Sequence, residues 1–154
     1  MKVLFIATLV IIFCSCKSNL DQASGIAETE KNKELVKRVY SEMVSKQNMS
    51  LIDSFYADNI FDHAAFEGQQ QGLAGFKKAV TELSAIFSHI EIKIEDIVAE
   101  RDVVSTRESW KVIRASDKKE ITGETMHWFR FKDGKITEEW SKGWEWLGPV
   151  TITN

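Results

Sequence analysis

The hydrophobic period of this chain changes once, near residue 89, and this change limits the folds open to it. Before it, apolar residues recur every three or four positions over 31–47 and 73–88, the spacing of amphipathic helices. After it, Ile90, Ile92 and Ile94 alternate with charged residues, as in a half-buried strand. Three further strand-like runs follow, near 102–114, 120–132 and 135–147. Helices followed by an antiparallel sheet predict an α+β domain with the helices on one face of the sheet.

Two short segments define connections within this domain. Ser50 is expected to be the N-cap of a short helix through Tyr56, because its hydroxyl can accept an otherwise unpaired backbone N–H. Asp133-Gly134 joins the last two strand-like runs, and this pair readily takes up the positive φ angles of a two-residue hairpin turn. The last two strands are therefore predicted to form a tight hairpin.

The hairpin register predicts which side chains share a face of the sheet. A two-residue turn places His127 opposite Trp140 and Phe129 opposite Glu138, and opposed side chains lie on the same face. The face that we expect to point inward is the more aromatic one, with Thr125, His127, Phe129, Phe131, Ile136, Glu138, Trp140, Lys142 and Trp144. A bulge of one residue would exchange the inner and outer sets on one strand.

Length and charge restrict the class of protein. The 154 residues correspond to about one domain. The net charge is −3 and no block of five or six like charges occurs, so the composition offers no electrostatic basis for binding nucleic acid. Both cysteines lie within the first sixteen residues, which excludes a disulfide framework for the domain.

The N-terminus has the pattern of an export signal. Lys2 precedes an apolar run from Val3 to Phe13, which is too short for a membrane-spanning helix. The run ends in Cys14-Ser15-Cys16, which resembles the lipobox of bacterial lipoproteins. The resemblance implies a signal peptide over 1–15, lipidation at Cys16 and a location in the cell envelope. Of the two membranes, it favours the outer over the inner. Residues 16–30 are polar and aperiodic, as expected of a flexible tether.

Several segments, taken in order, resemble the SnoaL-like branch of the NTF2-like superfamily over residues 31–148, with 149–154 as a short tail. They are Phe55–Asn59, Asp62-His63, Gly72–Phe76, and the run Phe129–Trp140 with its Asp-Gly turn. The resemblance implies a cone, in which a curved antiparallel sheet wraps around about three N-terminal helices and encloses an apolar pocket. The family includes cyclases, isomerases, dehydratases and non-catalytic binding proteins, so the fold alone does not decide the function.

Three residues are candidates for acid–base chemistry in such a pocket. His63 follows Asp62 where family members often carry a cavity-facing polar residue, and His127 is predicted to project from the inner face. Glu108 shares a largely apolar face of the second strand with Trp110, so burial would raise its pKa. For each histidine, a structural hydrogen-bonded role is the alternative, and for Glu108 the alternative is an ion-paired residue near the edge of the sheet.

The aromatic residues are candidates for ligand contact, because flat rings suit planar ligands. They are Trp110, Phe129, Trp140 and Trp144. Filling of the core is the alternative for each. Family cyclases place an aspartate at the position of Trp144, four residues after the tryptophan that corresponds to Trp140, so the resemblance carries no cyclase acid over to this chain.

The sequence therefore favours an envelope-anchored protein that binds a small hydrophobic or aromatic molecule in its cone. One alternative is an isomerase, cyclase or hydrolase that uses histidine or glutamate for acid–base catalysis. Another is a non-catalytic module that forms a homodimer through the outer face of the sheet, where Trp128 and Trp146 would lie. No spacing of ligands for a metal occurs, and no cofactor is expected.

Overall fold

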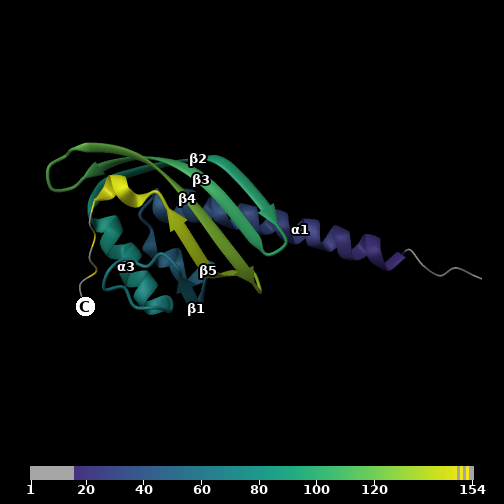
Figure 1. Cartoon of the computed structure of the whole chain (residues 1–154). Helices are drawn as coiled ribbons and strands as arrows, with labels where there is room; N and C mark the ends of the chain where they lie inside the picture. Colours follow the sequence, from purple (N-terminus) through teal and green to yellow (C-terminus); the bar gives the residue numbers. More distant parts are fainter. Residues whose placement is uncertain (1–15, 149, 151, 153–154) are drawn as a thin grey trace, which may run out of the picture.

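The computed structural model describes residues 16–148, 150 and 152, which form a curved sheet with helices against it (Figure 1). The elements before the sheet's long strands are α1 (Cys16–Arg38), the π-helical segment η1 (Val39–Val44), the 3₁₀ turn η2 (Met49–Leu51), α2 (Ile52–Phe55), strand β1 (Tyr56–Asp62) and α3 (Leu73–Ala85). Those that follow are β2 (Phe87–Glu100), β3 (Val103–Arg114), β4 (Glu120–Lys132), β5 (Lys135–Lys142) and the 3₁₀ turn η3 (Trp144–Leu147). The predicted α+β cone is confirmed.

The sheet has the strand order β1-β5-β4-β3-β2, with β1 parallel to β5 and the other pairs antiparallel. In Figure 1 the sheet arches over α3, while α1 runs along the sheet and its N-terminal end projects beyond it. The buried stripe of α1 and η1 packs against residues from the inner face of the sheet, and both sets belong to one hydrophobic core. Its members include Val36, Val39, Met43, Val104, Val112 and Phe129.

The helix α1 begins at Cys16, so residues 16–30, for which we predict a flexible tether, have helical backbone in the structure. Local interactions support the helix over residues 25–33: the Thr29 hydroxyl donates to the carbonyl oxygen of Gly25, and Lys33 pairs with Glu30. The C-terminal turns of α1 are packed in the core, and the rest of the helix extends from them toward its N-terminus. The first helical turn is therefore already formed, so the extension carries no cost of nucleation. The predicted signal peptide, 1–15, lies outside the described residues. Within the part of the chain that the structure describes, no helix is both long and apolar enough to cross a membrane.

The hairpin turn between β4 and β5 forms as predicted, but the register beyond it does not. Asp133 and Gly134 have φ angles of 51° and 75°, as a two-residue turn of this kind requires. Phe131 still pairs with Ile136, whereas the next pair is Arg130 with Glu138, so Thr137 is an extra residue on β5. This bulge reverses the facing of β5 from Glu138 onward.

The bulge corrects the predicted inner face. Glu139 and Ser141 now lie opposite Phe129 and His127, on the inside of the cone. Trp140 pairs with Trp128, and Glu138 pairs with Arg130. The predicted pairs of His127 with Trp140 and of Phe129 with Glu138 are therefore wrong, although the predicted facing of β4 is right.

Two other local predictions need correction. The Ser50 hydroxyl donates to the side-chain oxygen of Asn48, and α2 begins only at Ile52, so Ser50 is not its N-cap. The last strand ends at Lys142 and not near residue 147, because Gly143 takes a φ of 93° and turns the chain into η3. The turn at Gly143 carries Trp144 back over the inner face.

Candidate functional site

A pocket lies inside the cone, between the sheet and the helical segments η1 and α3. Its aromatic walls are Tyr40, Tyr56, Phe66, Phe76, Trp110, Phe129 and Trp144. The polar groups that reach it include Asp62, Gln69, His127, Glu139 and Ser141. The space open to the centres of water molecules is about 80 Å³, where one water needs roughly 10–15 Å³. The pocket therefore has room for a small molecule.

A buried carboxylate, Glu108 on β3, organises one wall. It accepts hydrogen bonds from the Tyr40 hydroxyl at 2.9 Å and from the Thr125 hydroxyl at 2.7 Å. Its Oε2 also lies 3.0 Å from Nδ1 of His127. The indole N–H of Trp110 donates to the Thr125 hydroxyl at 2.6 Å and so completes the network. Because β3 and β4 pair in register, Glu108, Trp110, Thr125 and His127 share the inner face of the sheet, and Tyr40 reaches them from η1.

The network shifts the pKa values of Glu108 and His127 in opposite directions. Burial alone would raise the pKa of Glu108, but its hydrogen bond and attraction to His127, with help from Thr106 and Thr125, hold that pKa below the ordinary value. Burial likewise opposes a charged His127, yet Glu108 and Glu139 outweigh it and raise the pKa of the imidazole. Both shifts favour a carboxylate–imidazolium pair, in which Nδ1–H donates to Glu108 and Nε2–H faces the pocket.

Glu139 on β5 is the second carboxyl group of the pocket. One of its oxygens lies 3.8 Å from Nε2 of His127, and the side chain is only 12% exposed. Burial raises the pKa of Glu139 to about 7. The charge of Asp62 supports this shift, whereas the charge of His127 and a hydrogen bond with the Tyr56 hydroxyl oppose it. Among the described residues, its Oε2 has no hydrogen-bond partner. The pocket thus holds a carboxyl group that titrates near neutral pH and has a free acceptor atom.

Asp62, at the end of β1, stands at the side of the pocket. Its two carboxylate oxygens accept from the backbone N–H of Ala64 at 2.9 Å and from the side-chain amide of Gln69 at 2.8 Å. The side-chain amide of Gln71 accepts a hydrogen bond from the backbone N–H of Asp62 and donates one to the backbone carbonyl oxygen of Asp62. These bonds hold the loop after β1 against the pocket.

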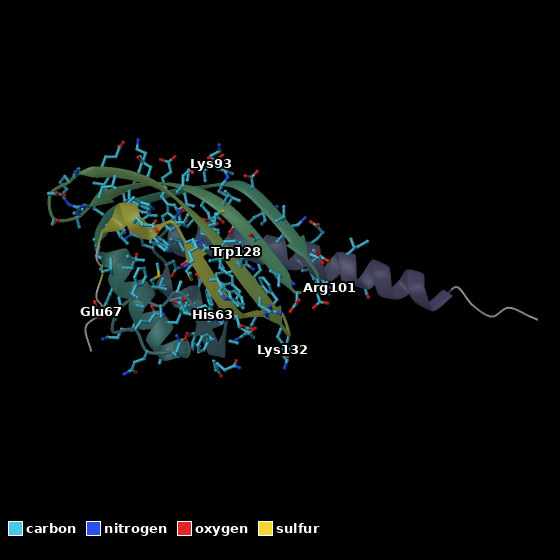
Figure 2. The ribbon with its side chains drawn as sticks, viewed as in Figure 1. His63, Glu67, Lys93, Arg101, Trp128 and Lys132 are labelled. Atoms are coloured by element: carbon cyan, nitrogen blue, oxygen red, sulfur yellow. The ribbon has the colours of Figure 1, made fainter. Side chains whose placement is uncertain are left out.

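The structure brings two of the three predicted catalytic residues together, Glu108 and His127. The third, His63, does not reach the inner pocket. It stacks on Trp140 with ring centroids 4.1 Å apart, and its Nε2 lies 2.8 Å from Glu138. His63 and Trp140 line a shallow groove on the other face of the sheet, beside Trp128 (His63 and Trp128 are labelled in Figure 2).

The predicted ligand-contact residues divide in the same way. Trp110, Phe129 and Trp144 line the inner pocket, but Trp140 lies on the outer face because of the bulge at Thr137. Trp144 reaches the pocket from η3 and not from a strand, and its indole N–H donates to Ser141 at 2.8 Å.

Sequence reasoning missed Glu139, Asp62 and Tyr40. Glu139 carried no signal, since a regular hairpin places it outside. Asp62 and Tyr40 had weak signals: Asp62 precedes His63 in the family-like segment, and Tyr40 lies on the apolar stripe of the first helix. In the described part of the chain, no group of three or more histidine, cysteine, aspartate or glutamate residues is placed to hold a metal ion.

Comparisons with known proteins agree with this architecture. A protein from Bacillus cereus ATCC 10987 that is assigned as a polyketide cyclase is 28% identical to this chain. The two structures superpose with a TM-score of 0.66 over 79% of this chain and 83% of that one. A SnoaL-like polyketide cyclase from Jannaschia sp. CCS1 is 16% identical, with a TM-score of 0.66 over 75% and 86%.

An LEH-like epoxide hydrolase of M. tuberculosis shares the fold at 16% identity, with a TM-score of 0.63 over 75% of this chain and 84% of that one. A search of the curated proteins finds no significant match. The family model described as SnoaL-like polyketide cyclase matches residues 34–143, well over half of the chain. The chain therefore belongs to the SnoaL-like polyketide cyclase family.

Proposed function

We propose that this domain is an acid–base enzyme that moves a proton on a small molecule bound in the cone pocket. The observation that carries the proposal is Glu139, a buried carboxyl group with a pKa of about 7. Its Oε1 lies 3.8 Å from Nε2 of His127, and its Oε2 has no hydrogen-bond partner among the described residues. A general base works best when its pKa lies near the working pH. The proposal differs from simple binding, because a site that only binds an apolar molecule needs no such carboxyl group.

The arrangement suits proton abstraction next to a carbonyl group. The Glu139 carboxylate takes the proton from carbon, so that a C–H bond breaks and an O–H bond forms on Glu139. The negative charge that moves to the substrate oxygen is stabilised by the N–H of His127 that faces the pocket. Glu139 then returns the proton to the same or another carbon atom, which gives exchange or isomerisation.

Glu108 acts in this scheme through His127. Its hydrogen bond to Nδ1 fixes the ring orientation and keeps the imidazole protonated, so that Nε2–H points at the pocket. It is a positioning residue, since it lies behind the histidine at 0% exposure. The aromatic walls exclude water, which strengthens the interaction between the imidazolium and a developing oxyanion.

The test is exchange of carbon-bound hydrogen in D₂O, followed by NMR with small cyclic ketones such as cyclohexanone, 2-cyclohexenone and N-methyl-4-piperidone. We expect at least one ketone to exchange faster than in buffer, at a rate that rises with pH through about 7 as Glu139 ionises. The variant Trp140→Phe is the control, because Trp140 lies on the outer face, and should leave the rate unchanged. Saturable binding of these ketones without any exchange would instead favour a binding protein.

We also propose that the chain is anchored to the cell envelope through a lipid on Cys16. The support is the apolar run of residues 3–13 and the lipobox-like segment that ends in this cysteine. Cys16→Ser should abolish incorporation of radiolabelled palmitate and release the protein from the membrane fraction. Cys14→Ser is the matched control and should retain the label; labelling of Cys16→Ser would contradict the assignment.

A further inference from the structure

Among the described residues that line the pocket, acidic side chains outnumber basic ones. Asp62 and Glu139 line it, and Glu108 lies directly behind its wall. The one basic side chain in this described lining is His127, which lies 3.0 Å from Glu108. Among the residues that the structure describes, no lysine or arginine lines the pocket. Asp62 and the ionised form of Glu139 therefore leave an excess of negative charge inside the cone.

The donors that surround Asp62 carry no charge. Its carboxylate accepts only a backbone N–H from Ala64 and an amide N–H from Gln69 among the bonds that the structure records. These bonds orient the carboxylate without neutralising it. Glu139 adds an acceptor atom, Oε2, that is buried and unpaired within the described chain. An unpaired buried acceptor is costly unless a ligand completes it.

Aromatic rings form the other walls of the same space. Tyr56 and Phe76 lie with their ring centroids 4.5 Å apart, and Phe66 meets Trp144 with centroids 6.1 Å apart. The face of an aromatic ring attracts a cation by about 0.5–2 kcal/mol, more where water is excluded. Carboxylates combined with aromatic faces are the chemistry that recognises an organic ammonium group.

We propose that the pocket binds a small organic cation, an ammonium group on an apolar body, with its N–H groups directed to Asp62 and to Oε2 of Glu139 and its body against the aromatic walls. This proposal about the cation rests on the proposed function in one respect: it names the class of substrate for the same pocket. A neutral molecule would leave the excess negative charge uncompensated, and an anion would be repelled by it.

Binding of a cation is expected to displace a proton from Glu139. The groups that face this carboxyl group are His127 from β4, Glu108 from β3, Asp62 and Tyr56 from β1, and Tyr40 from η1. With burial, they set its pKa to about 7 in the free protein. A cation beside it favours the carboxylate, so binding below pH 7 releases a proton and becomes stronger as the pH rises.

The test is calorimetric titration of the full protein with two pairs of probes matched in shape, benzylammonium with benzyl alcohol and isobutylammonium with isobutanol. We expect at least one ammonium probe to bind ten or more times as tightly as its alcohol at pH 8, with a smaller preference at pH 5.5. Titrations at pH 6 in buffers of different ionisation enthalpy should record proton release for the ammonium probe and none for the alcohol.

Two variants separate this mechanism from general electrostatics. Glu139→Gln should abolish the proton release and the pH dependence while retaining the alcohol affinity. Glu138→Gln removes the same charge from the neighbouring residue, which pairs with His63 and Arg130 on the outer face, and should change neither. Alcohols that bind as tightly as both ammonium probes, or a preference that is the same at pH 5.5 and 8, would overturn the proposal.

The outcomes for the cation and for catalysis are distinguishable. If a ketone exchanges with the pH dependence described above but neither ammonium probe is preferred, the catalytic proposal stands and the cation proposal is wrong. If an ammonium probe is preferred and all three ketones bind without exchange, the pocket recognises a cation and the catalytic proposal is wrong.

Discussion

Replacing Glu139 by glutamine is expected to lower the rate of catalysed exchange by about 10²–10⁴-fold, the usual contribution of a positioned general base. The amide has nearly the shape of the carboxyl group but cannot accept the proton. The rate that remains should no longer rise through pH 7, because the group with a pKa of about 7 has been removed. Single-turnover and steady-state exchange rates across pH 5–9 measure both effects.

The same variant is expected to be more stable than the parent protein at high pH. The pKa of Glu139 is about 7 in the folded protein against an ordinary value of 4.5, so the folded state holds the additional proton between these values. Raising the pH through this window therefore lowers the free energy of unfolding of the parent protein, by up to about 3 kcal/mol. Glutamine removes that loss, which urea unfolding at pH 5 and pH 9 would detect.

The combination of lost activity and increased stability excludes unfolding as the cause of the loss. Glu138→Gln is again the matched control, because Glu138 lies one residue away on the outer face of β5. It should retain the exchange rate within about twofold, since it has no contact with the pocket. Full activity of Glu139→Gln would show that Glu139 is not the base.

Replacing Glu108 by alanine is expected to destabilise the domain by about 3–5 kcal/mol, the cost of removing one partner of a buried ion pair. The change leaves a charged His127 and two hydroxyl groups, from Tyr40 and Thr125, without their acceptor. Such a loss is a large part of the 5–15 kcal/mol that typically stabilises a domain. Glu124→Ala, at an exposed position of β4, should cost less than about 0.5 kcal/mol.

Glu108→Gln tests the same network if the alanine variant fails to fold. It keeps the size and one acceptor oxygen but removes the charge that favours the imidazolium. We expect a smaller destabilisation, about 1–3 kcal/mol, and a lower pKa of His127, visible in the NMR titration of its ring protons. An unchanged histidine titration and unchanged stability would contradict the role of Glu108 as the residue that positions and charges His127.

The sequence predicted those features that depend on local periodicity. Alternation along β4 identified its inner face, and Asp133-Gly134 identified the hairpin turn, because both are properties of a few adjacent residues. The pairing of Glu108 with His127 could be predicted only in part from the sequence. Each was placed on an inner face, but their 3.0 Å separation depends on the pairing of β3 with β4, which the pattern of either strand alone does not encode.

The features that escaped prediction depend on contacts between distant segments. The extra residue at Thr137 has no compositional mark, yet it decides whether Glu139 or Trp140 enters the pocket. Strand β1 was missed because it is stabilised by pairing with β5, some eighty residues away, and its own burial pattern does not alternate. The turn at Gly143 was missed because a single glycine within a strand-like run does not reveal its φ angle.

The bulge on β5 means that this strand encodes two alternative linings for one cavity. With Thr137 looped out, the interior receives a carboxyl group and a hydroxyl group, from Glu139 and Ser141; in an uninterrupted ladder it would receive Glu138 and the indole of Trp140. Gain or loss of one residue beside the hairpin can therefore exchange a lining of carboxyl and hydroxyl groups for one of a carboxyl group and an indole, without any substitution. In this chain, the length of the turn region is thus a determinant of the pocket's chemistry separate from the identity of the residues that follow it.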